Sequence, residues 1–190
     1  MEVDQFVTLI KDDKPMKMST RKAQYVTLDE LIDEVGEDVV RYFFLMRGMN
    51  THLNFDMDLA QDESDENPVY YLQYAHARLC NILKHAETMG FELDQNADLS
   101  PLTLEVEIQL IKSLMEFPTI IERSHENLEP QTIASYLQWT ATEFHKFYSK
   151  HRVVTDDKEL TRARLVLVSA VKTVLANGLE ILGISQPEKM

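Results

Sequence analysis

Repeated helix start and stop signals constrain the fold of this chain most strongly, and they fill its last two thirds. Asn67 before Pro68 is an N-cap followed by proline at the first helical position, and Gly90 stands where such a helix would end. The apolar residues between them recur at the spacing of one helical face: Leu72, Ala75, Leu79, Ile82, Leu83 and Ala86. We therefore predict a helix from Pro68 to about Met89.

Similar signals predict four more helices in the rest of the chain. Ser100-Pro101 repeats the start signal, and Pro118 is expected to break the helix that follows. A shorter helix then runs to about Asn127, followed by helices over 129–149 and 157–182. Helices joined by short loops predict an antiparallel α-helical bundle.

Signals of mixed type fill the first part of the chain. Val3–Ile10 is rich in β-branched and aromatic residues and is predicted to be extended. Thr27-x-x-Glu30 is a capping box that begins a helix, and 37–47 reads as a second, buried helix. Apolar and polar residues alternate over 53–59, as in a strand. These patterns together predict a small α/β unit.

A strongly polar run, Gln61–Glu66, separates the two parts. We place a domain boundary there, between residues 1–65 and residues 66–190. The predicted fold class is mainly α, with an antiparallel helical bundle preceded by the small α/β unit. No apolar run approaches the roughly 20 residues that cross a bilayer, so we expect no membrane partner.

The charge of the chain is unevenly distributed. A net charge of −13 argues against indiscriminate nucleic-acid binding, and no DNA partner is expected. Residues 146–164, however, hold six bases against three acids, a local charge of +3. An acidic body with one basic segment suits a protein that touches RNA at chosen points, although a solvated helix face explains the same charges.

Metal and disulfide chemistry are not indicated by the sequence. Cys80 is a single cysteine without a ligand-spaced partner, which favours a reduced, cytoplasmic protein. The histidines show no ligand-like mutual spacing: His52, His76, His85, His125, His145 and His151. We therefore assign no metal.

A basic hexapeptide precedes the first predicted helix. It reads Lys17, Met18, Ser19, Thr20, Arg21 and Lys22. Ammonium and guanidinium groups on a loop can stabilise the charge that develops on a leaving pyrophosphate. It is not a Walker loop, because no glycine-rich phosphate cradle is present. The alternative is a solvated turn.

Two aromatic groups are candidates for contacting RNA. The first, at the start of the Pro68 helix, comprises Tyr70, Tyr71, Gln73, Tyr74 and His76, and Arg78 follows it on the same helix. Tyr71, Tyr74 and Arg78 share one helical face, and tyrosine offers both a stacking surface and a hydroxyl for unpaired bases. The second is Tyr148, beside Lys150 and Arg152. The alternative for the tyrosines is that they line the bundle core.

Several segments in order along the chain resemble bacterial arginyl-tRNA synthetases, a class I family. They are Lys17–Arg21, Arg41–Arg47, His52–Asp56, Glu66–Arg78 and the ending Gly183–Met190. The resemblance implies that residues 1–65 are the end of a class I catalytic domain and that residues 66–190 are a helical anticodon-binding domain. It also implies that Tyr148 and Met190 lie near the anticodon pocket.

The resemblance further assigns roles to the basic hexapeptide. Lys17, Ser19, Thr20 and Arg21 would be catalytic, as a KMSKS-like loop, and Lys17, Met18 and Lys22 would bind ATP. The hexapeptide departs from the common pattern, because Thr20 and Arg21 replace a lysine and a serine. Which base supplies the missing charge is therefore open.

The resemblance also implies the partners of a longer parent protein. That parent would use ATP with magnesium to join arginine to arginine tRNA in the cytoplasm, and a monomeric parent is favoured. The paired-histidine motif His-x-Gly-His is absent, so this chain alone is expected to be inactive and to bind no cofactor. The alternative function is a non-catalytic helical adaptor that binds a protein partner.

Overall fold

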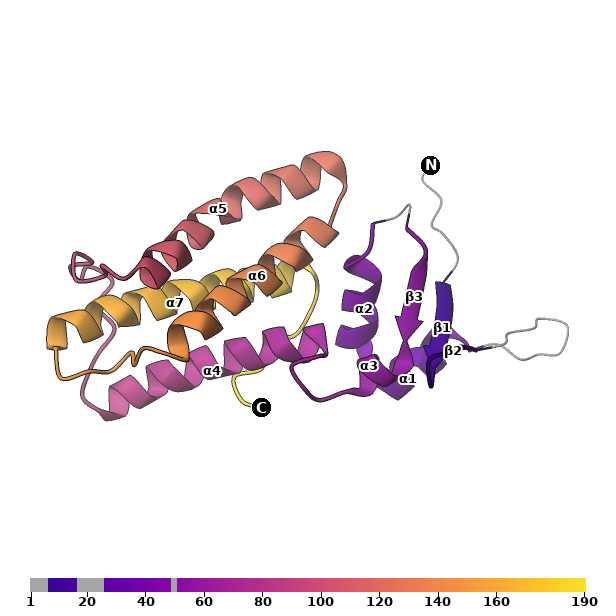
Figure 1. Ribbon diagram of the computed structural model, residues 1–190, viewed down its shortest axis with the longest axis horizontal. Helices are drawn as coiled ribbons and strands as arrows, with labels where there is room; N and C mark the ends of the chain where they lie inside the picture. The colour runs from indigo at the N-terminus through magenta and orange to yellow at the C-terminus, as the bar shows by residue number, and fades with distance from the viewer. Residues whose placement is uncertain (1–6, 17–25, 49–50) are drawn as a thin grey trace, which may run out of the picture.

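A computed structural model describes residues 7–16, 26–48 and 51–190, and it has a small α/β unit beside a bundle of long helices (Figure 1). The α/β unit contains β1 (Val7–Lys11), β2 (Lys14–Pro15), α1 (Leu28–Val35), α2 (Glu37–Leu45), β3 (Leu53–Asp56) and α3 (Met57–Gln61). The bundle contains α4 (Pro68–Thr88), α5 (Glu105–Asn127), α6 (Gln131–Tyr148) and α7 (Lys158–Ile181). The predicted fold class is confirmed. Among the described residues, no helix is long and apolar enough to span a membrane.

The α/β unit is built on a three-stranded sheet of order β2-β1-β3. β1 pairs antiparallel with β2 and parallel with β3. The predicted capping box of α1 is confirmed, because Thr27 Oγ1 accepts from the Glu30 amide at 3.2 Å and Glu30 Oε2 accepts from the Thr27 amide at 2.8 Å. The predicted extended segment Val3–Ile10 overlaps β1, and its first residues lie outside the described ones.

The strand predicted over 53–59 is half right. β3 ends at Asp56, whose carboxylate accepts from the amides of Asp58 and Leu59 at 3.0 Å each. This side chain acts as an N-cap and begins α3. The strand therefore ends at Asp56, although the alternation of apolar and polar residues continues. The Asp56 side chain accepts the hydrogen bonds of the next amides, so these no longer need a neighbouring strand.

The start of α4 follows the predicted signal and joins the two parts of the molecule. Asn67 Oδ1 accepts from the amides of Val69 and Tyr70, as an N-cap does. Its Nδ2 donates to the carbonyl of Asp62 at 2.9 Å and to that of Ala60 at 3.2 Å. One buried side chain therefore fixes both the first turn of α4 and the segment that leads into it.

Two predictions for residues 101–127 are wrong. A single helix, α5, replaces the two helices that were expected, and it begins at Glu105 instead of Pro101. The Glu107 carboxylate accepts from the Leu104 amide at 3.0 Å, which closes a cap that the Ser100-Pro101 signal does not supply. Pro118 lies inside α5 on an exposed position, where water can solvate the carbonyl that loses its donor. The bundle thus has four long helices within the described residues.

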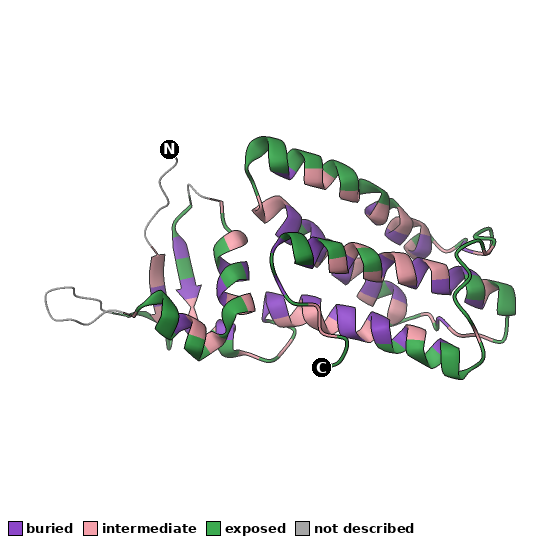
Figure 2. Cartoon of the chain, turned by 180° about the vertical axis from the view of Figure 1, so that it is seen from behind, coloured by how far each residue is buried: buried purple, intermediate pink, exposed green. Residues whose placement is uncertain are grey.

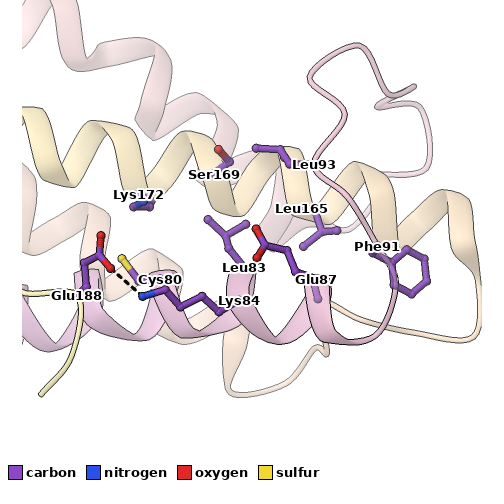
Figure 3. A pocket seen from close by; sticks show the side chains of 11 residues that line it. Cys80, Leu83, Lys84, Glu87, Phe91, Leu93, Leu165, Ser169, Lys172 and Glu188 are labelled. Atoms are coloured by element: carbon purple, nitrogen blue, oxygen red, sulfur yellow. Dashed lines mark hydrogen bonds and ion pairs between the residues drawn. The ribbon is translucent and has the colours of Figure 1, made fainter.

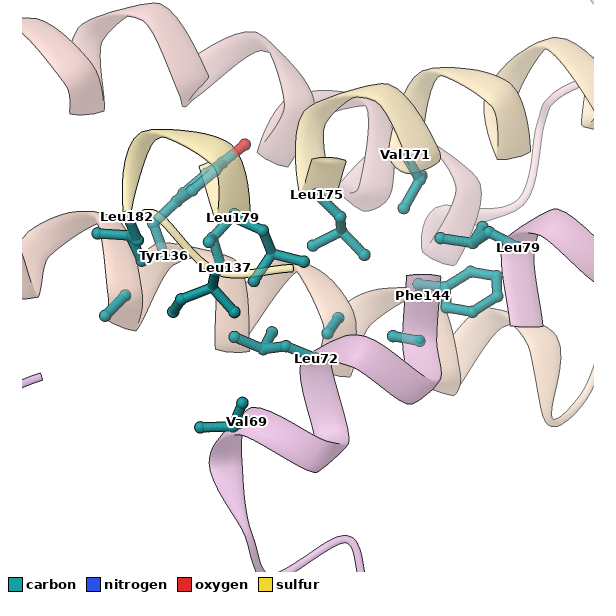
Figure 4. Packing of buried hydrophobic residues seen from close by; sticks show 14 of the residues in the cluster. Val69, Leu72, Leu79, Tyr136, Leu137, Phe144, Val171, Leu175, Leu179 and Leu182 are labelled. Atoms are coloured by element: carbon teal, nitrogen blue, oxygen red, sulfur yellow. The ribbon is translucent and has the colours of Figure 1, made fainter. Parts of the chain in front are cut away.

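The core of the bundle lies where α4, α6 and α7 meet (Figure 4). Leu72 of α4, Leu137 and Phe144 of α6, and Leu175 and Leu179 of α7 are fully buried. Gly178 lets α7 approach α6 closely, since a Cβ there would lie 2.4 Å from Leu137 Cδ2. α5 covers this core from outside, and Figure 2 shows that much of its outer surface is exposed.

Candidate nucleic-acid interface

A groove of about 1190 Å³ runs between α4 and the segment 148–156, which begins at the last residue of α6. Six residues predicted to contact RNA line this groove together: Tyr74, Arg78, Tyr148, Lys150, Arg152 and Met190. They come from positions up to 116 residues apart in the sequence. The fold therefore gathers both aromatic groups and the chain end at one site.

The centre of the groove is formed by two tyrosines and an arginine. The Arg78 guanidinium carbon lies 4.6 Å from the centre of the Tyr74 ring and 5.5 Å from that of Tyr148. A nitrogen of Arg78 also donates to the Tyr74 hydroxyl. All three side chains are half-buried, so each keeps an accessible edge or face.

A buried ion pair holds the far wall of the groove. Arg164 of α7 donates from Nε to Glu107 Oε1 at 2.8 Å and from Nη1 to the Arg152 carbonyl at 2.7 Å. Arg164 also stacks over the Phe147 ring, with its guanidinium carbon 5.6 Å from the ring centre. The backbone at Arg152 is thereby tied to α5 and α7, while the Arg152 side chain is exposed towards the groove.

A second set of contacts fixes the end of the same segment. Thr155 and Thr161 exchange hydrogen bonds, with the Thr155 amide donating to Thr161 Oγ1 at 2.9 Å. Val153, which also lines the groove, is buried. The 148–156 segment is therefore anchored at Arg152 and at Thr155, on either side of its buried Val153.

The lining of the groove is basic although the chain is acidic. Arg78, Lys150 and Arg152 carry positive charge there, and Asp156 is the acidic side chain among the lining residues. His145 lies under this surface, with its ring centre 5.0 Å from that of Tyr71 and 6.3 Å from that of Tyr74. Burial, aided by the nearby Arg78 charge, lowers the pKa of His145 below its ordinary value. The histidine is therefore neutral near neutral pH.

Three residues predicted to contact RNA lie outside the groove. The Tyr71 hydroxyl donates to Thr142 of α6 at 3.3 Å. Gln73 Nε2 donates to Asp38 Oδ2 at 2.8 Å and to Ser185, which ties α4 to α2 and to the C-terminal segment. His76 is buried, and its Nδ1 lies 3.0 Å from the Pro187 carbonyl. These side chains bind α6, α2 and the C-terminal segment instead, and we leave them out of the proposed contact surface.

The C-terminal segment delivers Met190 to the groove. After α7 it passes along α4, as Figure 1 shows, and is held at three points. Ser185 binds Asp38 through its amide, at 3.1 Å, and through its hydroxyl. The Pro187 carbonyl meets His76, and Glu188 pairs with Lys84 at 2.7 Å. The Met190 side chain ends half-exposed at the groove wall.

Sequence reasoning missed two kinds of residue at this site. Asn81 and His85 also line the groove, and they continue the Tyr74–Arg78 face at helical spacing, so the periodicity could have found them. The Glu107–Arg164 pair joins residues 57 positions apart and carries no local signal.

The basic hexapeptide cannot be placed by this structure. Lys17, Met18, Ser19, Thr20, Arg21 and Lys22 all lie outside the described residues. Their predicted catalytic and ATP-binding roles therefore stay predictions.

A second cavity, of about 310 Å³, lies between α4 and α7 (Figure 3). Lys84 pairs with Glu188 at 2.7 Å, and Lys172 and Glu87 also line this cavity, so its charges are of both signs. Cys80 faces it with a pKa raised mainly by burial. None of the residues predicted to contact RNA lines this cavity.

Comparisons with known proteins agree with these features. A family model described as the DALR anticodon binding domain matches residues 72–190. The arginine–tRNA ligase of Salinibacter ruber is 54% identical over 186 residues, which cover 98% of this chain and 33% of that protein. The chain spans about a third of the length of the curated relatives it matches.

Solved structures give the same result. A Campylobacter jejuni protein assigned as an arginyl-tRNA synthetase superposes with a TM-score of 0.85 and 32% identity, over 98% of this chain and 40% of that one. The Thermus thermophilus arginyl-tRNA synthetase superposes with a TM-score of 0.79 and 25% identity, over 97% of this chain and 34% of that one. Both matches include the α/β unit as well as the bundle.

Proposed function

Because this chain belongs to the DALR anticodon-binding domain family, we propose that it is the anticodon-binding part of an arginine–tRNA ligase. Its partner is arginine tRNA, whose anticodon loop enters the groove between α4 and the 148–156 segment. The proposal is supported by one observation above others. The fold brings Tyr74, Arg78 and Tyr148 together with a basic rim on an otherwise acidic chain.

The chemistry of the groove suits unpaired bases. Flat tyrosine rings stack on bases, and each well-stacked base contributes on the order of 1–3 kcal/mol. Lys150 and Arg152 stand on the anchored segment, where their charges can reach phosphates on either side of a stacked base. Stacking then supplies the affinity for the loop, while the basic rim sets the path of the backbone.

The α/β unit is proposed to be the end of a catalytic domain, with a boundary near residue 65. In the parent protein, ATP with magnesium and arginine would be the other substrates, and Lys17 to Lys22 would supply charge at the ATP site. The parent works in the cytoplasm, and this chain alone is inactive in adenylate formation. These assignments rest on the similarity to arginine–tRNA ligases.

The decisive experiment is a binding titration with two RNAs. The chain is titrated calorimetrically with arginine tRNA and with the same tRNA carrying another anticodon. We expect tighter binding to the first. Equal affinity for both RNAs, or no binding of either, would contradict the proposal and favour a helical adaptor for a protein partner.

A variant pair tests which residues do the binding. Tyr148→Ala should weaken binding by about 1–3 kcal/mol while the thermal midpoint stays near that of the wild type. Tyr71→Phe is the matched control, since it removes a hydroxyl that bonds to Thr142 away from the groove. A larger loss of affinity in the control than in Tyr148→Ala would show that the proposed contact surface lies on the wrong face of α4.

A further inference from the structure

The Arg78 guanidinium is the middle layer of a column of flat groups that crosses from α4 to α6. On α4, the rings of Tyr70 and Tyr74 lie 6.3 Å apart and within 10° of parallel. On α6, the rings of Phe144 and Tyr148 lie 5.7 Å apart and within 20° of parallel. Arg78 fills the layer between them, 4.6 Å from the Tyr74 ring centre and 5.5 Å from that of Tyr148.

Arg78 is held in this layer by weak contacts. Arg41, Arg162 and Arg164 each pair with a glutamate. In contrast, no carboxylate of the described part of the chain lies within ion-pair distance of Arg78. Its partners are the two tyrosine faces and the Tyr74 hydroxyl. A guanidinium over a partly exposed ring is only weakly bound, so another flat group can displace Arg78 from between the two tyrosine rings.

A guanidinium and a nucleobase compete for the same kind of surface. Both are flat and delocalised, and both stack on aromatic faces. We propose that the layer between Tyr74 and Tyr148 is a slot for one unpaired nucleobase, and that Arg78 occupies it until a base enters. This inference rests on the proposed function and adds that Arg78 acts as a placeholder. Once displaced, its charge remains in the basic groove and binds the RNA backbone.

If Arg78 is a placeholder, its removal should change the affinities for two ligands in opposite directions. Adenosine, a neutral nucleoside, gains nothing from the Arg78 charge, and it must displace the guanidinium to stack. Arg78→Ala should therefore bind adenosine roughly three- to tenfold more tightly than the wild type. The same variant should bind an RNA hairpin with the arginine anticodon loop more weakly. The slope of log K against log salt concentration should fall by about one, because one phosphate contact is lost.

Two further variants separate stacking from charge and from fold. Arg78→Lys keeps the charge but loses the flat group, so it should gain adenosine affinity while the salt dependence of hairpin binding stays that of the wild type. Arg123→Ala removes an exposed arginine from the outer surface of α5 and should change neither ligand's affinity. Adenosine binding is followed by NMR shifts of the tyrosine rings and hairpin binding by fluorescence anisotropy, with a thermal melt of each variant.

The outcomes distinguish the slot from the function on which it rests. A purely structural Arg78 would lower both affinities on substitution, and adenosine affinity that is unchanged or reduced in both Arg78→Ala and Arg78→Lys overturns the placeholder. If the wild-type chain still prefers the arginine anticodon in that case, only the slot fails. If it shows no preference, the proposed function fails, and the adenosine comparison still decides whether the slot accepts a base.

Discussion

Removal of one partner of the Glu107–Arg164 pair should destabilise the whole bundle. Glu107 is 0% exposed and Arg164 5%, so Glu107→Gln leaves a buried guanidinium without its counter-charge. Breaking a buried pair in this way costs about 3–5 kcal/mol, which is a large fraction of the roughly 5–15 kcal/mol that stabilises a typical protein. With a urea m-value of about 2–3 kcal/mol/M, the unfolding midpoint should fall by roughly 1–2.5 M.

The control for this measurement is an exposed ion pair on α7, the helix that carries Arg164. Arg162 and Glu159 meet at 2.8 Å near the start of α7, with side chains 48% and 65% exposed. Because exposed pairs contribute about 0–1 kcal/mol, Glu159→Gln should barely move the midpoint. Equal midpoints for Glu107→Gln and Glu159→Gln would refute the argument that burial gives the first pair its weight.

A double variant then separates stability from the shape of the groove. Replacing a buried pair by apolar residues is often neutral or stabilising, so Glu107→Leu with Arg164→Met should recover most of the lost stability. It cannot restore the hydrogen bond to the Arg152 carbonyl, and the far wall of the groove is released. We expect tRNA affinity to fall several-fold in a protein that is still stable. Unchanged affinity would show that Arg164 does not hold the groove.

Three further predictions concern other contacts. Gly178→Ala should destabilise the bundle by about 1–3 kcal/mol in urea unfolding, because its Cβ would lie 2.4 Å from Leu137 Cδ2; a neutral result would mean that α6 and α7 can separate freely. Lys150→Ala should weaken tRNA binding equally for both anticodons and lower the salt slope by about one contact, whereas loss of anticodon preference would make Lys150 a base reader. The pKa of His145 is depressed in the folded chain, so the unfolded chain binds its proton first; stability should therefore be full above the ordinary pKa of 6.5 and decline as pH falls through and below it. His145→Gln should flatten this part of the pH profile of the unfolding midpoint, and an unchanged profile would exclude His145 as its cause.

Local signals predicted the parts of the fold that local chemistry decides. The caps at Thr27 and Asn67 are side chains that bond to amides two or three residues away, so their patterns can be read along the sequence. Pro118 misled the prediction because a proline breaks a helix only where nothing else holds it. Neighbouring Phe117 and Ile121 pack against the core and keep α5 continuous.

The candidate site was predictable in kind but not in arrangement. Aromatic spacing on α4 and the basic segment after α6 indicated RNA, yet the same pattern included Gln73 and His76, which the fold uses to hold the C-terminal segment. Periodicity assigns residues to a helical face but cannot say which neighbour covers that face. The path of residues 183–190 along α4 covers His76, whereas the 148–156 segment lies beside Tyr74 and Arg78 and forms the groove with them.

Under the proposed function, the charge distribution lets an acidic chain select one RNA. Non-specific affinity grows with the number of phosphates neutralised, and a net charge of −13 keeps that contribution small over most of the surface. The basic side chains of the groove act over a short range at ordinary ionic strength, so they attract RNA that is already placed by stacking. Binding should then depend mainly on whether a base fits between the tyrosines. An RNA with a paired or blocked loop gains the phosphate contacts alone, and the acidic body of the protein opposes its approach.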